Sequence, residues 1–205
     1  MVDSEILAGR AFSQYLAKIN INLSEKEFSK TYAGNKLIEV VSKLSSRFNI
    51  KNQEVFFKDA MTLAHTIYTN ELTAVSGVKR FLDIIHQKKL ISSNSGKQRI
   101  IDGLKKVNLN KYFDEKNIFS IDIVNRPKPY PDIYKFCIKK GEKVLIIGDN
   151  IRTDIKGANN MEFDSLFITD GIHKDEFFDL QLQNYDKILK KYGAKTNYYQ
   201  KRLTW

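Results

Sequence analysis

The chain has 205 residues, of which 42% are hydrophobic and 12% aromatic, with 3 Pro and 10 Gly. This composition excludes a disordered or fibrous protein, and the length suits one or two domains. The formal charge is +10, from 34 Lys and Arg against 24 Asp and Glu, which fits an anionic partner. Because the basic residues are scattered rather than clustered, a small phosphorylated metabolite fits better than a nucleic acid.

Neither a membrane nor export is indicated by the sequence. No stretch approaches the roughly 20 continuous apolar residues of a membrane helix. Residues 1–5 contain Asp3 and Glu5 where a secretory signal needs a basic segment followed by an apolar one. We therefore expect a cytoplasmic location. The single cysteine, Cys137, excludes an internal disulfide framework, and we interpret it as a small apolar residue of a helix.

Residues 1–75 are predicted to form a small helical bundle. Apolar residues recur at helical spacing over 5–19, 35–48 and 52–72. Residues 24–27, Ser-Glu-Lys-Glu, have the spacing of a capping box and predict the start of a further short helix. Consecutive amphipathic helices of this kind bury their apolar faces against one another.

From about residue 76, helical segments alternate with short apolar runs, which is typical of an α/β domain with a parallel sheet. We expect this domain to span residues 76–180 and to be followed by a basic helix and a polar tail over 181–205. A helix is predicted near 78–85. The predicted strands are 89–93, 118–120, 143–147 and 165–169, and the predicted helices between them are 96–107, 131–140 and 151–159.

The residues that follow each strand carry the most information, since open parallel sheets bind ligands beyond the carboxyl ends of their strands. The strand at 89–93 ends in Ser93 and Asn94 and leads into a helix, whose unpaired N–H groups favour an anion. These two side chains can bind a phosphoryl oxygen. The alternative interpretation is ordinary capping of the helix by Asn94 or Ser95.

Two acids follow the strand at 143–147: Asp149 comes directly after Gly148, and Asp154 lies five residues later. Two carboxylates form a hard oxygen site, and Mg²⁺ prefers one or two of them together with waters and substrate phosphate. The sequence therefore indicates a Mg²⁺ site at this strand end. Alternatively, an Asp at a strand end caps the helix that follows.

One lysine, Lys128, is bracketed by Pro127 and Pro129, which restrict the backbone around it. An ammonium held in this way can balance the charge of a phosphate. The alternative is a stiff loop with a solvated lysine, and the prolines alone do not distinguish the two.

Taken in chain order, Ser93-Asn94, Lys128-Pro129, and Gly148-Asp149 with Asp154 resemble motifs two, three and four of the haloacid dehalogenase-like (HAD) superfamily of phosphatases and phosphomutases. The segment 2–5, Val-Asp-Ser-Glu, resembles the sequence that follows motif one in the phosphoglucomutase- and phosphoglycolate-phosphatase-like branch. The later segments 147–159 and 170–173 are more similar to members of the other cap class.

The resemblance implies an α/β fold, with a Rossmann-like parallel-sheet core at 76–180 and an N-terminal helical-bundle cap at 1–75. It also implies roles for the motif residues. Ser93 and Asn94 bind the phosphoryl group, Lys128 stabilises its charge as the catalytic lysine, and Asp149, assisted by Asp154, holds Mg²⁺. We interpret His173, in the loop after the last predicted strand, as family loop sequence without a catalytic role.

Motif one of the superfamily, Asp-x-Asp-Gly, does not occur in the 205 residues. Its first Asp attacks phosphorus and its second is the general acid and base. The resemblance places this motif at the end of the central strand, so we expect a core that lacks its first strand. The buried side chains of that strand contribute roughly 5–12 kcal/mol. Three explanations stay open: a start further upstream, a fragment that folds poorly, or another segment in the strand's place.

The sequence thus predicts a HAD-like phosphatase of a small phosphate monoester, with Mg²⁺ as cofactor. Because the nucleophile motif is absent, we expect the chain as written to be inactive. The alternative is a non-catalytic remnant or pseudoenzyme that binds phosphate or Mg²⁺ without turnover. A nucleic-acid binder is a third and weaker alternative, indicated only by the positive charge.

Overall fold

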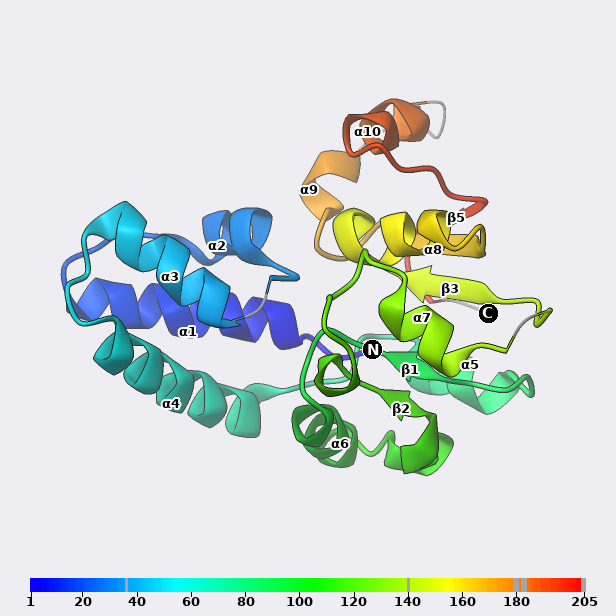
Figure 1. The fold of residues 1–205 in the computed structure, drawn as a ribbon, viewed down its shortest axis with the longest axis horizontal. Helices are drawn as coiled ribbons and strands as arrows, with labels where there is room; N and C mark the ends of the chain where they lie inside the picture. Colours follow the sequence, from blue (N-terminus) through cyan, green and yellow to red (C-terminus); the bar gives the residue numbers. More distant parts are fainter. Residues whose placement is uncertain (36, 140, 179–180, 182–183, 204–205) are drawn as a thin grey trace. The chain divides into compact units, whose positions relative to one another are not determined.

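The computed structural model describes residues 1–35, 37–139, 141–178, 181 and 184–203. The chain divides into two compact units, Met1–Val75 and Ser76–Trp205 (Figure 1). In the described part of the chain, no helix is both long enough and apolar enough to cross a membrane.

The first unit is a helical bundle in which side chains cap the starts of two helices. The Ser24 hydroxyl accepts a hydrogen bond from the Glu27 N–H at 3.1 Å, as the capping box predicts. The Asn52 side chain likewise accepts from the Val55 N–H at 3.1 Å. The helices are α1 (Ser4–Lys18), α2 (Glu25–Tyr32), α3 (Leu37–Phe48) and α4 (Gln53–Glu71). Residue 36, within the third predicted helix, lies outside the described residues.

Three aromatic rings form the centre of the bundle and come from three different helices. Phe12 of α1 stacks on Phe28 of α2, with ring centroids 4.9 Å apart, and meets Phe56 of α4 edge-on at 5.9 Å. None of the three side chains is more than 2% exposed. Burying a side chain of this size contributes about 1.5–3 kcal/mol. The bundle therefore has an apolar core of its own.

The second unit is an α/β domain with parallel strands, as predicted. Its strands form two sheets, one of β1 and β2 and one in the order β3, β4, β5. No described strand hydrogen-bonds to both β1 and β3. The strands are β1 (Ile91–Ser92), β2 (Ile118–Phe119), β3 (Leu145–Gly148), β4 (Asp164–Ile168) and β5 (Tyr198–Gln200).

Helices connect these strands, and several differ in detail from the prediction. Residues 151–159, predicted as one helix, form a π-helical turn followed by a short α-helix. The helices are α5 (Val78–Ile84), α6 (Lys97–Lys106), α7 (Asp132–Cys137), α8 (Lys156–Asn160), α9 (Lys174–Phe177) and α10 (Tyr185–Lys191), and the shorter turns are η1 (Asn110–Tyr112), η2 (Glu115–Asn117), η3 (Ile121–Ile123) and η4 (Ile151–Ile155).

The strand β5 was not predicted, because its sequence is polar and lies in the segment interpreted as a tail. It pairs parallel with β4, and Tyr199 lies opposite Phe167. The Tyr199 ring meets Tyr185 of α10 edge-on at 5.2 Å, and its hydroxyl donates to Asp186. The tyrosine rings therefore bury apolar area for β5, although its sequence lacks the alternating apolar residues that usually predict a strand. Trp205, at the end of the predicted tail, lies outside the described residues.

Replacing Phe12 by Ala should lower the free energy of unfolding by about 3–5 kcal/mol, because the cavity lies between two buried rings. Urea denaturation followed by circular dichroism measures the change. Ile38→Ala is the matched control, since Ile38 is 57% exposed in the same bundle and should change the stability by no more than about 0.5 kcal/mol. Similar losses in both variants would contradict this description of the core.

Candidate functional site

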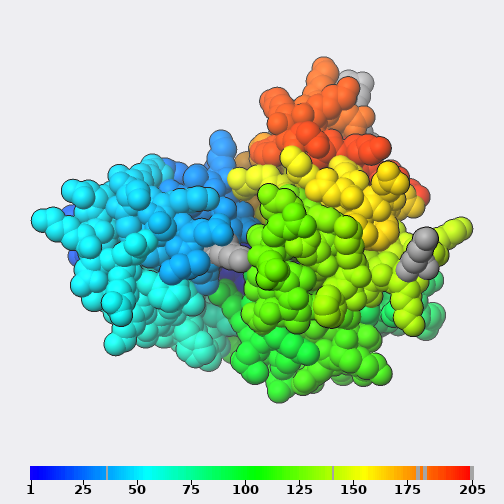
Figure 2. Space-filling view, viewed as in Figure 1, coloured from blue at the N-terminus to red at the C-terminus, as the bar shows by residue number. Residues whose placement is uncertain are grey.

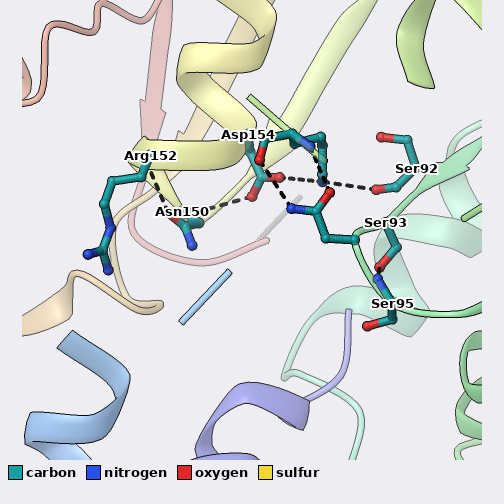
Figure 3. A network of polar contacts seen from close by, with 8 residues as sticks. Ser92, Ser93, Ser95, Asn150, Arg152 and Asp154 are labelled. Atoms are coloured by element: carbon teal, nitrogen blue, oxygen red, sulfur yellow. Dashed lines mark hydrogen bonds and ion pairs between the residues drawn. The ribbon is translucent and has the colours of Figure 1, made fainter. Parts of the chain in front are cut away.

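The residues after β1 hold a distant segment of the chain rather than their own helix. The Asn94 side chain accepts a hydrogen bond from the Lys128 N–H at 2.8 Å and donates one to the Lys128 carbonyl at 3.2 Å. The Ser93 hydroxyl accepts from the Ser95 N–H at 3.1 Å (Figure 3). Asn94 therefore fixes the backbone of Lys128 on both sides of that residue, and Ser93 orders the turn after the strand.

The N-cap residue of α6 is Gly96, and the structure shows Asp122 binding the first turn of this helix, while capping by Asn94 or Ser95 stays an alternative. The Lys97 N–H, in the first turn of α6, donates to the Asp122 carboxylate of η3 at 2.6 Å. Asp122 also accepts a hydrogen bond from the Ser120 hydroxyl at 3.0 Å. The sequence analysis expected the unpaired N–H groups at the start of this helix to favour an anion. One of them, the Lys97 N–H, instead binds the Asp122 carboxylate, which corrects that expectation.

Lys128 is buried and forms an ion pair, so the alternative interpretation as a solvated loop lysine is wrong. Its ammonium donates to the Ser92 carbonyl at 3.0 Å and to an Asp154 carboxylate oxygen at 2.6 Å. The two charged side chains are only 10% and 15% exposed. Burial by itself lowers the pKa of Lys128, but the attraction of Asp154 outweighs it and holds that pKa above its ordinary value. Lys128 is therefore a permanent cation at the end of β1.

Both predicted metal-binding carboxylates pack against glycine backbone, which explains why glycine occurs at these positions. A Cβ added to Gly148 would overlap the Asp154 side chain, and one added to Gly171 would overlap the Asp149 side chain. The Ile172 N–H donates to an Asp149 carboxylate oxygen at 3.1 Å. The glycines therefore let the backbone approach the carboxylates closely enough to orient them.

The loop after β3 is capped by Asn150 rather than by Asp149. The Asn150 side chain accepts from the Arg152 N–H at 3.0 Å, at the start of η4. The Asn150 N–H in turn donates to the second Asp154 carboxylate oxygen at 3.2 Å. Figure 3 shows the Arg152 guanidinium pointing away from Asp154. Asp149 is thus not used for capping, which leaves its carboxylate for the site.

The electrostatics of the two acids suit a divalent cation. Burial, followed by repulsion from Asp154, raises the pKa of Asp149. Among the described residues, no group of three or more candidate ligands surrounds a common point. Mg²⁺ usually takes one or two protein carboxylates, with waters and a phosphate completing its shell, and Asp149 and Asp154 are donors of this kind. The donor set fits this ion.

Tyr134 of α7 is a site residue that the sequence analysis missed. Its side chain is 1% exposed, and burial raises its pKa to about 12. The ring lies against Gly157 of α8, where an added Cβ would come within 2.9 Å of a ring carbon. The Asn160 side chain donates to the Pro129 carbonyl at 2.9 Å. These contacts join the Lys128 segment to α8, and Figure 2 shows the two segments, in green and yellow, in contact.

Lys128→Met should lower the free energy of unfolding by about 3–5 kcal/mol, because it leaves the Asp154 carboxylate buried without its cation. Adding Asp154→Asn should recover part of this loss, and a double-mutant cycle from urea denaturation measures it. Arg126→Met is the control, since the Arg126–Asp132 pair is exposed on the arginine side and should change stability little. An equal loss of stability in Lys128→Met and Arg126→Met would contradict the buried ion pair.

The sequence and the fold both resemble known proteins. The 6-phosphogluconate phosphatase of Escherichia coli (strain K12) is 24% identical over 160 residues, covering 74% of this chain and 70% of that protein. A conserved haloacid dehalogenase-like protein of unknown function from Agrobacterium tumefaciens has the same fold, with a TM-score of 0.76, 24% identity and coverage of 99% and 89% of the two chains.

A further solved structure, a HAD family hydrolase from Deinococcus radiodurans with bound phosphate and sodium, gives a TM-score of 0.70 at 20% identity, covering 97% of this chain and 86% of that one. The protein-family model of haloacid dehalogenase-like hydrolases matches residues 1–168, most of the chain. On this match, the chain belongs to the haloacid dehalogenase-like hydrolase family.

Proposed function

We propose that this chain acts on a small phosphate monoester as a Mg²⁺-dependent HAD-like phosphatase. One observation carries the proposal: a buried ammonium and two carboxylates lie together at the carboxyl ends of β1 and β3. Ligands of open parallel sheets bind at this end of the strands. The relative from E. coli is named a phosphatase, and the structure from D. radiodurans holds a phosphate.

Lys128 is the proposed partner of the phosphoryl oxygens. Its charge is permanent, and its backbone is fixed by two hydrogen bonds to Asn94. A cation that is already held in place costs little reorganisation when negative charge develops on a phosphate. Ser93 supplies a hydroxyl at the same strand end. Asn94 contributes chiefly by holding Lys128, although its position beside Ser93 also lets it line the phosphate site.

Asp149 and Asp154 are the proposed protein ligands of Mg²⁺. When bound, the ion neutralises charge on the phosphate and on both carboxylates. Asp149 is oriented by the Ile172 N–H, and Asp154 is oriented by Lys128 and the Asn150 N–H. Asp154 is therefore both the ion-pair partner of Lys128 and a proposed metal ligand beside Asp149. In this way one carboxylate belongs to the proposed phosphate site and to the proposed metal site.

The attacking carboxylate is assigned to no residue, since Asp-x-Asp-Gly does not occur among the 205 residues. The second candidate function is the alternative in which the same residues bind phosphate and Mg²⁺ without turnover. The two functions share the binding site and differ only in the chemical step. Binding and hydrolysis therefore have to be measured separately.

Asp149→Asn should abolish Mg²⁺ binding measured by isothermal titration calorimetry, because the amide cannot supply the negative charge that a hard cation needs. In the parent chain, saturating Mg²⁺ should raise the melting temperature, since a ligand that binds only the folded state stabilises it. Asp164→Asn is the matched control: Asp164 is an exposed acid at the amino end of β4, the opposite end of the strands. This control should bind Mg²⁺ as the parent does.

Hydrolysis of a generic phosphate monoester by the parent chain, dependent on Mg²⁺ and lost in Asp149→Asn, supports the phosphatase. Binding of Mg²⁺ and inorganic phosphate without hydrolysis supports the non-catalytic alternative. If the parent chain binds neither, or if Asp164→Asn loses binding as Asp149→Asn does, the proposed site is wrong.

A further inference from the structure

A buried polar cluster of His173, Glu176 and Tyr192 lies in the second unit, and the proposed phosphate and metal chemistry does not use it. His173 is only 3% exposed, and its Nδ1 lies 2.7 Å from a Glu176 carboxylate oxygen. The Tyr192 hydroxyl donates to both oxygens of the same carboxylate at 2.8 Å. Burying a polar group costs free energy unless the group is hydrogen-bonded. A buried polar cluster of this kind therefore needs a structural or functional explanation.

The Glu176 carboxylate is the common hydrogen-bond partner in this cluster. Burial, followed by the hydrogen bond to Glu176, raises the pKa of Tyr192 to about 12, so this hydroxyl stays a donor at neutral pH. Glu176 then accepts from both partners, and His173 donates through Nδ1. The His173 Nε2 is buried and has no hydrogen-bond partner among the described residues.

The His173 ring is held on three sides. It packs edge-on against Tyr192, which follows α10, with centroids 5.1 Å apart, and against Phe167 of β4 at 6.4 Å. Glu176 of α9 holds the third side. These contacts involve the strand and both C-terminal helices, so the position of the His173 backbone is determined by packing as well as by hydrogen bonding.

This backbone position bears directly on Asp149. The residue before His173 is Ile172, whose N–H donates to the Asp149 carboxylate, and the residue before that is Gly171, which packs on the same side chain. The start of this loop is held elsewhere, because the Asp170 N–H donates to the Lys201 carbonyl at 3.1 Å. The segment 170–173, which contacts the proposed metal ligand Asp149, is therefore held at one end by Asp170 and at the other by His173.

We infer that His173, held by Glu176 and Tyr192, is a positioning residue that sets the Ile172 N–H against Asp149 and so tunes the Mg²⁺ site. The inference rests on the proposed function, since it takes Asp149 as a metal ligand. Groups that orient a ligand in this way are commonly worth a factor of about 10–100 in metal affinity. A residue with a purely structural role would lower stability and leave the metal affinity unchanged.

The first test compares three variants of the full chain by calorimetric titration with Mg²⁺, below the melting temperature of the least stable one. His173→Leu removes the hydrogen bond and should weaken Mg²⁺ binding by about 10–100-fold. His173→Asn keeps an N–H donor near the Nδ1 position and should restore most of the affinity. Phe177→Leu is the matched control, because Phe177 packs on Phe167 at 5.1 Å in the same cluster; it should lower stability but not Mg²⁺ affinity.

The second test needs no metal. Amide hydrogen exchange in the metal-free chain should be faster at Ile172 in His173→Leu than in the parent, while the amides of Phe167 and Ile168 in β4 keep their protection. If the parent binds no Mg²⁺, the proposed metal function fails, and the exchange at Ile172 alone decides whether His173 positions the loop. If His173→Leu does not fold, Tyr192→Phe replaces it, with a smaller change in the same direction.

Unchanged Mg²⁺ affinity together with unchanged exchange at Ile172 would overturn the inference. So would an equal loss of affinity in Phe177→Leu, because that result assigns the effect to general loosening of the cluster.

Discussion

The candidate site depends on one buried ion pair, between the Lys128 ammonium and the Asp154 carboxylate. Taking either charge out of water costs several kcal/mol, and only the partner, together with hydrogen bonds to the remaining donors and acceptors, offsets that cost. The Ser92 carbonyl and the Asn150 N–H provide those hydrogen bonds. Because no described strand hydrogen-bonds to both β1 and β3, this pair is a direct link between the ends of the two sheets.

The same pair sets the charge of the site. Two buried acids face one ammonium, so the site carries an excess of negative charge, and repulsion between the acids contributes to the raised pKa of Asp149. A negatively charged site does not by itself attract a phosphate ester. A divalent cation reverses the balance, after which the cation and Lys128 both favour an anion. The formal charge of +10 acts in the same direction at longer range. Metal binding and phosphate binding are therefore expected to be coupled.

The sequence predicted the parts of the structure that local rules determine. The positions of Ser93 and Asp149, directly after β1 and β3, followed from the apolar runs before them, and the cap at Ser24 followed from its spacing. Contacts between distant segments were not predictable in this way. Asp122 caps a helix that begins 25 residues earlier, and His173 gains its role from an aromatic residue 19 positions later. Such pairs arise from tertiary packing, which leaves no periodic signal in a single sequence.

The residues of the candidate site all belong to one of the two units. The bundle closes on itself: its first and last segments pair, with the Val75 N–H donating to the Met1 carbonyl at 2.9 Å and Val2 bridging Ala74. Its core is aromatic and aliphatic, whereas Lys128, Asp149 and Asp154 all lie in the second unit. A unit whose ends lie together can change its helices without displacing the sheet of its neighbour. The glycines and hydrogen bonds that orient the two carboxylates and the ammonium likewise belong to the second unit.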